Sequence, residues 1–279
     1  MRWQNRLVLH SDEQTNQLLH AITGLLEKYR SARPSVYLHG SRLNGSSQPS
    51  SDIDVTVILR DPTWQVHLGN DLRNLDLDLP VRLDASVYSL AMLNSAEHGY
   101  EAGRILNAGD LVCGEDVRPL LTTEFVQTAH HNRTLEQACK GIALLRGVEQ
   151  VPTQLDFPDD RYFFLGYELV RKPSWYADGA SFGTKELVAT ATWCASAWLA
   201  ANAGVAVYSK YDAVDRYATT RCDANGELVA DLWQLCRVNL AYTLPEGQDD
   251  RSQLRLLCAR FLQLEREIAS LNSGIASPR

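Results

Sequence analysis

The sequence predicts an α+β fold in which a small mixed sheet is followed by a bundle of helices. Two observations support this prediction. Between about residues 36 and 115, short apolar runs typical of strands alternate with segments of helical periodicity. After about residue 120 the strand-like runs cease, and segments with helical periodicity follow one another. We therefore expect a mixed-sheet domain over residues 1–118 and an all-α domain over residues 119–279.

The first helix is predicted by apolar residues at helical spacing between Leu18 and Tyr29. A capping box at Ser11-Asp12-Glu13-Gln14 would begin it, and Arg33-Pro34 would end it, because proline cannot continue a helix. Apolar runs and turn residues predict the other elements of this half. They are strands at about 36–39 and 53–60, a helix at 64–75, a strand at 81–88, a helix at 89–108 with breaks at Gly99 and Gly103, and a short strand at 111–114.

The second half is predicted to be helical except for one loop. Residues 151–160 contain two prolines and several acids, a composition typical of loops. The expected helices cover residues 122–146, 161–171, 184–203, 210–218, 226–243 and 250–271.

Composition and charge exclude several classes of protein. The net charge of −7 argues against a protein that holds nucleic acid by bulk electrostatics. No window approaches 18 uninterrupted apolar residues, so no membrane span is expected. The first residues lack the apolar core of a signal peptide, and the six cysteines have no zinc-site spacing. We expect a cytoplasmic protein with reduced cysteines in its core.

The most informative stretch runs from Val36 to Leu59, V-Y-L-H-G-S-R-L-N-G-S-S-Q-P-S-S-D-I-D-V-T-V-I-L. It predicts a strand, a tight turn at Gly40-Ser41, a polar excursion, and a second strand that begins with two carboxylates. Asp52 and Asp54 are two residues apart, so their side chains share one face of that strand. Such a pair repels unless a divalent cation holds it together, and a glycine turn lets backbone N–H groups approach a phosphate. The stretch therefore predicts nucleoside triphosphate binding through a metal, with nucleotidyl transfer as the chemistry.

These residues resemble the signature of the DNA-polymerase-β-like nucleotidyltransferase superfamily. That signature is a small-residue turn, here Gly40-Ser41, followed after ten residues by D-x-D, here Asp52-Ile53-Asp54, with a third carboxylate on a later strand. Residues 81–88 supply such a strand, with Asp84 near its start. The resemblance implies that Asp52 and Asp54 bind Mg²⁺, and that Asp84 binds a second metal or acts as general base on the acceptor hydroxyl.

Other residues near the signature have alternative interpretations. Asp76 and Asp78 compete with Asp84 for the third position, because they precede the same strand in an L-D-L-D-L-P stretch. Ser41 would donate its hydroxyl and its backbone N–H to the β- or γ-phosphate. Arg42 would either contact phosphate or be solvated.

The helical half resembles streptomycin/spectinomycin-type aminoglycoside adenylyltransferases. Residues 184–204 resemble a helix of that family, and Lys210 then matches a lysine that reaches the ATP phosphates. Lys185, at the start of the helix, is a second candidate. The acceptor-binding Trp and Asp of the family have rough counterparts in Trp175 and Asp178. The chain departs from the family in having no arginine in this helix, and in having Asp84 where the family has a glutamate.

These resemblances imply an enzyme that transfers AMP from ATP, with Mg²⁺, to a hydroxyl of a small aminoglycoside-like molecule. An acidic cleft would suit a polycationic acceptor. Two alternatives stay open. The acceptor could instead be tRNA or a protein, as in toxins of this superfamily, although the composition does not favour the basic surface that this requires. The chain could also be a non-catalytic nucleotide-binding module, which the intact set of three carboxylates argues against.

Overall fold

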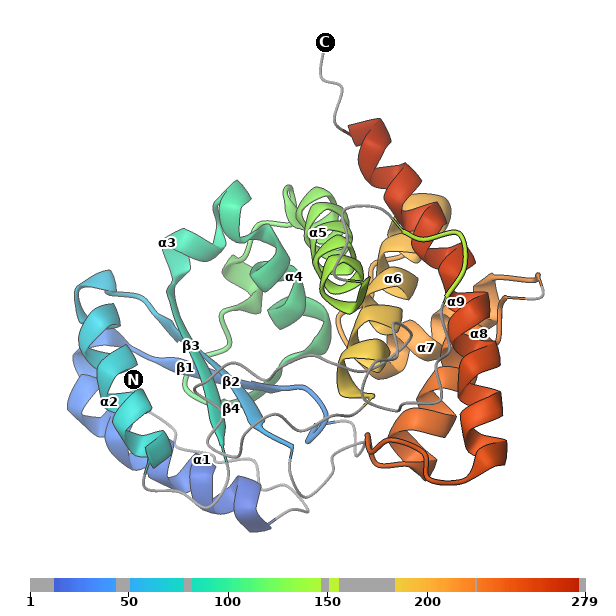
Figure 1. The fold of residues 1–279 in the computed structure, drawn as a ribbon. Coiled ribbons are helices and arrows are strands. Elements are labelled where there is room, and N and C mark those ends of the chain that lie inside the picture. The colour runs from blue at the N-terminus through green and yellow to red at the C-terminus, as the bar shows by residue number, and fades with distance from the viewer. Residues whose placement is uncertain are drawn as a thin grey trace. The chain divides into compact units, whose positions relative to one another are not determined.

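The computed structural model describes residues 13–43, 51–77, 82–146, 151–155, 184–223 and 225–275. The chain divides into two compact units, residues 1–130 and 131–279, and each is considered by itself (Figure 1). The capping box expected at Ser11 and the helix expected at 161–171 lie outside the described residues.

The first unit contains a four-stranded mixed sheet. Strand β1 (Ser35–His39) pairs antiparallel with β2 (Ile53–Leu59) on one side and with β4 (Asp110–Cys113) on the other. Strand β3 (Leu83–Ser89) pairs parallel with β2, so that the order across the sheet is β3-β2-β1-β4. Together with the helices that follow, this sheet confirms the predicted α+β class.

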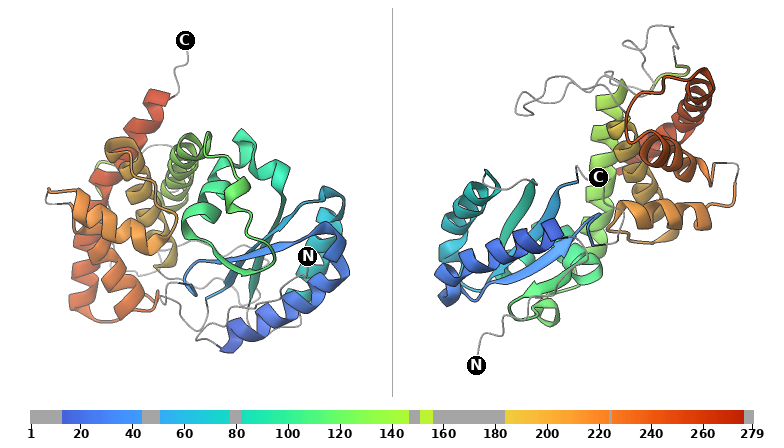
Figure 2. Two further views of the ribbon diagram at one scale, coloured as in Figure 1. Left: turned by 180° about the vertical axis from the view of Figure 1, so that it is seen from behind. Right: turned by 90° about the horizontal axis from the view of Figure 1, so that it is seen from below.

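Helices cover both faces of this sheet (Figures 1 and 2). Helices α1 (Glu13–Leu26) and α2 (Gln65–Leu77) pack on the face that carries Val36, Val55 and Val57. Helices α3 (Leu90–Leu93) and α4 (Gly99–Ala108) pack on the other face, against Tyr37 and Ile58. Because side chains alternate between the faces of a strand, Asp54 and Thr56 belong to the α4 face together with Ile58.

The expected break at Gly103 is wrong, because Gly103 lies inside α4. The helical segment is interrupted earlier, at Asn94-Ser95, and a 3-10 turn at Ala96–His98 leads into α4. Gly99 has a packing role. A Cβ there would lie 2.9 Å from both the Phe125 carbonyl oxygen and the Ala129 Cβ, so the glycine permits close approach of the neighbouring segment.

The second unit is helical in the part of it that the structure describes. Helix α6 (Lys185–Ala203) is buried along most of its length and packs against α7 (Lys210–Thr220), α8 (Leu228–Leu232) and α9 (Gln248–Ile275). Helix α8 continues as a π-helical turn, Trp233–Asn239, and α5 (Val126–Arg146) leads into the unit. The remaining 3-10 turns, all in the first unit, are Glu27–Ala32, Pro62–Trp64 and Arg118–Leu120. Among the described residues, no helix is long and apolar enough to cross a membrane.

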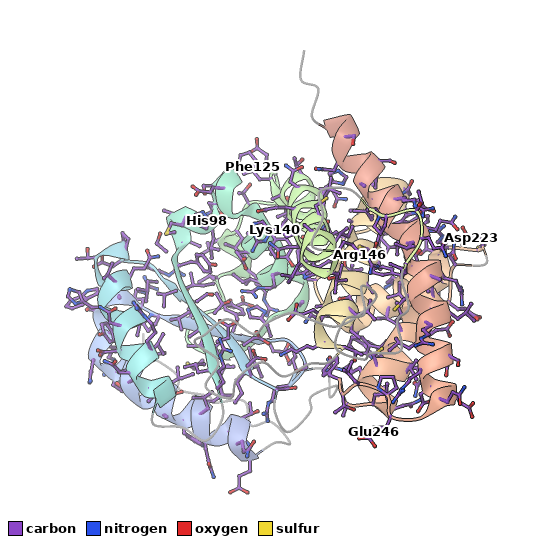
Figure 3. All side chains as sticks on the ribbon, viewed as in Figure 1. His98, Phe125, Lys140, Arg146, Asp223 and Glu246 are labelled. Atoms are coloured by element: carbon purple, nitrogen blue, oxygen red, sulfur yellow. The ribbon has the colours of Figure 1, made fainter. Side chains whose placement is uncertain are left out.

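A buried ion pair joins α5 to α9 inside this unit, and Arg146, its member on α5, is labelled in Figure 3. Arg146 and Glu265 have side chains only 1% and 0% exposed, and Arg146 Nε donates to Glu265 Oε2 at 2.8 Å. Burial raises the pKa of Glu265, and the hydrogen bond from Arg146 opposes that rise. Removing either partner alone would leave an uncompensated buried charge, which costs about 3–5 kcal/mol of stability.

Candidate functional site

Three strand termini meet at one end of the sheet. Because β1 is antiparallel to β2 and β3 is parallel to it, the end of β1 lies beside the beginnings of β2 and β3. The backbone N–H of Ile53 donates to the Arg82 carbonyl oxygen at 2.9 Å, which ties the two beginnings together. The residues predicted to form a site lie at these termini.

Asp54 and Asp84 are direct neighbours across the parallel pair β2–β3. Paired residues on adjacent strands point to the same face, and their Cα atoms are about 4.8 Å apart. Both aspartates therefore belong to the face that α4 covers. Asp52 precedes β2 by one residue and is half-buried, whereas Asp84 is exposed. Of the competing acids, Asp76 lies in α2 with its side chain undescribed, and Asp78 lies outside the described residues.

Gly40 follows β1 and is in contact with the Asp54 carboxylate. Its φ of 77° lies in the left-handed region, which glycine adopts without strain. A Cβ on Gly40 would lie only 2.1 Å from Asp54 Oδ2, so the absence of a side chain makes room for the carboxylate. The Gly40 turn is therefore in contact with the second aspartate of the D-x-D sequence.

Ser41 and Arg42 continue this turn, which the hydrogen bond from the Leu43 N–H to the Gly40 carbonyl oxygen closes at 3.2 Å. Ser41 is half-buried. Arg42 Nη2 donates to the Ser51 carbonyl oxygen at 2.7 Å and so joins the two ends of the polar excursion. This contact places Arg42 beside the segment that leads into Asp52.

His39 is an uncharged residue under the turn. It is 2% exposed and pairs with Asp54 across β1 and β2. Burial, and then the nearby charge of Arg104, lower the pKa of His39 to about 3, so that the ring is neutral at physiological pH. His39 Nδ1 lies 3.3 Å from the Ala108 carbonyl oxygen, which assigns the ring proton to Nδ1.

An ion pair on α4 lies over the same face of the sheet. Arg104 Nη2 is 2.9 Å from Glu101 Oε2 and donates to Thr56 Oγ1 at 3.2 Å. Sequence reasoning missed both residues because it placed helix breaks at Gly99 and Gly103. An uninterrupted helix would have indicated them, since an acid and a base three residues apart lie on one helix face.

The oxygen atoms at this end of the sheet fit a small divalent cation. Carboxylates are the hard ligands that Mg²⁺ takes, usually one or two of them together with water and substrate phosphates. Asp54 and Asp84 supply two carboxylates side by side, and Asp52 precedes them. Among the described side chains, no three His, Cys, Asp or Glu residues lie close enough to form a ligand set by themselves. A cation here would therefore also need oxygen atoms from a bound phosphate group.

A protein-family model described as a nucleotidyltransferase domain matches residues 21–108, the part of the chain that carries this arrangement. Residues 21–108 are therefore a nucleotidyltransferase domain. The superfamily predicted from the glycine turn and the aspartates is thereby confirmed, and with it an enzyme of the nucleotidyltransferase class. A search of curated proteins found no match.

One solved structure shows a related fold. The chain is similar to the spectinomycin adenyltransferase AAD(9) from Enterococcus faecialis, whose crystal structure contains ATP and spectinomycin. The sequences are 10% identical, the TM-score is 0.52, and the match covers 90% of this chain and 99% of the other. At this identity the likeness is one of fold. A toxin–antitoxin structure with AMP-PNP matches 43% of this nucleotidyltransferase and 90% of its own chain, at 22% identity and a TM-score of 0.27.

The two predicted phosphate-binding lysines lie at opposite ends of one helix. Lys185 is the first residue of α6, and Lys210 follows its other end, where Ser209 caps α7. Both are exposed. A helix of 19 residues is about 28 Å long, so only one of these lysines can reach a given triphosphate. The predicted acceptor-binding residues Trp175 and Asp178 lie outside the described residues.

Replacing Gly40 with alanine should destabilise the nucleotidyltransferase and displace the Asp54 carboxylate. A Cβ at this φ costs about 1–2 kcal/mol, and its collision with Asp54 Oδ2 adds to that cost. Gly24→Ala is the matched control, because Gly24 lies in α1 with open space around it and alanine favours the helix by about 1 kcal/mol. Urea unfolding measures the free energy of unfolding of both variants. Equal stability of Gly40→Ala and the wild type would contradict the geometry.

Proposed function

We propose that this nucleotidyltransferase transfers AMP from ATP, in a Mg²⁺-dependent reaction, to a hydroxyl group of a small molecule. The observation that carries the proposal is the pairing of Asp54 with Asp84 on adjacent parallel strands, with the Asp54 carboxylate against the Gly40 turn. This arrangement offers carboxylates to a cation and leaves a backbone turn beside them for phosphate. The likeness in fold to a spectinomycin adenyltransferase solved with ATP supports the choice of ATP and of a small acceptor.

Each residue of the site has a distinct task in this proposal. Asp52 and Asp54 would hold Mg²⁺, which would neutralise phosphate charge and favour departure of pyrophosphate. Gly40 and Ser41 would donate backbone N–H groups, and Ser41 its hydroxyl, to the β- or γ-phosphate. Arg42 would add a positive charge at the same turn. None of these groups reacts covalently, so their contribution is positioning and charge stabilisation.

The transfer itself involves one bond formed and one broken. The acceptor hydroxyl oxygen forms a bond to the α-phosphorus, and the bond from that phosphorus to the β-bridging oxygen breaks in line. Pyrophosphate leaves with the electron pair of the broken bond. Asp84, in the strand beside Asp54, accepts the proton from the hydroxyl, which makes it the general base. A role for Asp84 as a ligand of a second cation is the alternative.

The proposal is tested by incubating the protein with Mg²⁺ and labelled ATP, CTP, GTP or UTP in the presence of aminoglycosides, spectinomycin or tRNA. We expect label from ATP on a small acceptor, and loss of at least nine-tenths of that transfer in Asp54→Asn. The control is Asp110→Asn, because Asp110 is exposed on the same sheet and pairs with Leu38, which faces α1 and α2. Label on tRNA alone, or an active Asp54→Asn variant, would refute the proposal.

Asp84→Asn separates the two roles of the third carboxylate. If Asp84 is the base, turnover should fall by about 10²-fold or more while Mg·ATP affinity stays nearly unchanged, because a base acts on the acceptor proton alone. If Asp84 is chiefly a metal ligand, Mg·ATP affinity should fall as well. Calorimetry gives the affinity and the labelling assay gives turnover. Normal turnover would remove Asp84 from both roles.

We assign phosphate binding in the helical half to Lys210 in preference to Lys185. Lys210 is the residue that matches the ATP-contacting lysine of the adenylyltransferases that the helical half resembles. Like Lys185, it opens a helix, whose positive dipole end would favour an anion. Lys210→Ala should weaken ATP binding by about ten- to a hundred-fold, the scale of a lost charge-assisted hydrogen bond. Lys185→Ala is the matched control, since Lys185 is also exposed and opens α6. If Lys185→Ala weakens binding and Lys210→Ala does not, the assignment reverses.

A further inference from the structure

The ion pair on α4 has no task in the proposed transfer, although it lies beside the carboxylates. Glu101 and Arg104 have side chains 20% and 24% exposed, so both charges are largely removed from water. The two residues lie three positions apart in the helix, and their charged groups are 2.9 Å apart. Removing two charged groups partly from water costs free energy of desolvation. An ion pair exposed on the surface would not have this cost.

The position of Arg104 relative to Asp54 follows from one hydrogen bond, and an electrostatic effect on His39 agrees with it. Arg104 Nη2 donates to Thr56 Oγ1 at 3.2 Å, and Thr56 lies two residues after Asp54 on the same face of β2, about 7 Å along the strand. The charge of Arg104 also lowers the pKa of His39, the residue that pairs with Asp54 from β1. The guanidinium therefore lies over the face of β2 that carries Asp54, one row of side chains farther along the strand.

At this distance each charge of the pair, taken alone, would act on a bound cation. A unit charge about 8 Å from a divalent ion changes the ion's binding by roughly five-fold even with the dielectric constant of bulk water, and by more in protein surroundings. Arg104 alone would repel the cation and Glu101 alone would attract it. Because Glu101 and Arg104 are paired, their effects on the cation largely cancel. The affinity for the metal then depends mainly on the carboxylates of Asp52, Asp54 and Asp84.

We propose that Glu101 neutralises Arg104 and so keeps this guanidinium from weakening the binding of a divalent cation by the carboxylates. The inference rests on the proposed function, since it takes these carboxylates as the metal site. It predicts that altering the two members of the pair changes metal affinity in opposite directions. A purely structural role for the ion pair predicts instead that either change weakens the site in the same direction.

The test measures binding of Mn²⁺, as an electron paramagnetic resonance probe, to the full chain with a non-hydrolysable ATP analogue at low salt. Glu101→Gln leaves Arg104 uncompensated and should weaken Mn²⁺ binding by at least about five-fold. Arg104→Gln leaves Glu101 uncompensated and should strengthen it by a similar factor. The double variant should return to within about two-fold of the wild type, because additive charge effects cancel. The Mg²⁺ concentration that half-saturates turnover should follow the same order.

Control variants keep the outcomes distinct. Arg104→Lys and Glu101→Asp retain the charges and should bind Mn²⁺ as the wild type does, and thermal unfolding identifies any variant that fails to fold. Glu136→Gln alters an exposed pair with Lys140 on α5 and should have no effect on Mn²⁺. Single variants that shift Mn²⁺ affinity in the same direction, or not at all, would overturn the proposed neutralisation of Arg104 by Glu101. Asp54→Asn with undiminished Mn²⁺ binding would instead overturn the metal site itself, and with it the proposed function.

Discussion

The parallel pairing of β2 with β3 is the constraint on which the proposed site depends. Its register sets Asp54 opposite Asp84, and side chains alternate along each strand. A slip of one residue would move Asp84 to the opposite face, among the residues that pack against α1 and α2, and would bury a carboxylate among apolar side chains. The apolar residues Leu83, Ala85 and Val87 prevent the slip, because they fill that face in the observed register. The core of the first unit thus fixes the spacing of the carboxylates.

The same register gives the charged groups of this face an order along the strands. The aspartates occupy the row nearest the open end of the sheet, where His39, Asp54 and Asp84 lie side by side on three strands. The next row places Thr56 under Arg104. Beyond it lie Ile58 and the apolar residues of α3 and α4. The side chains on this face therefore become less polar with distance from the open end of the sheet. The ion pair of α4 lies between the row of aspartates and the apolar core.

The sequence predicted more of the strands than of the helices around them. Short apolar runs and the turn at Gly40 located β1 and β2, with the aspartates of D-x-D at the beginning of the second strand. That β3 lies beside β2 could only be inferred by resemblance, since the order of strands in a sheet depends on long-range packing. The helix over Gly99 was misjudged for a related reason. A glycine that serves close packing with Phe125 and Ala129 cannot be told from a helix break by local propensity.

The buried pair of Arg146 and Glu265 has a consequence for how this sequence can change. A single replacement that removes the charge at either position leaves one unpaired charge in the interior of the helical unit, whereas a paired replacement by apolar residues of similar volume does not. The two positions are 119 residues apart in the chain but behave as one unit under mutation. In random mutagenesis with selection for folding, positions 146 and 265 should therefore be found either both charged, with opposite signs, or both uncharged.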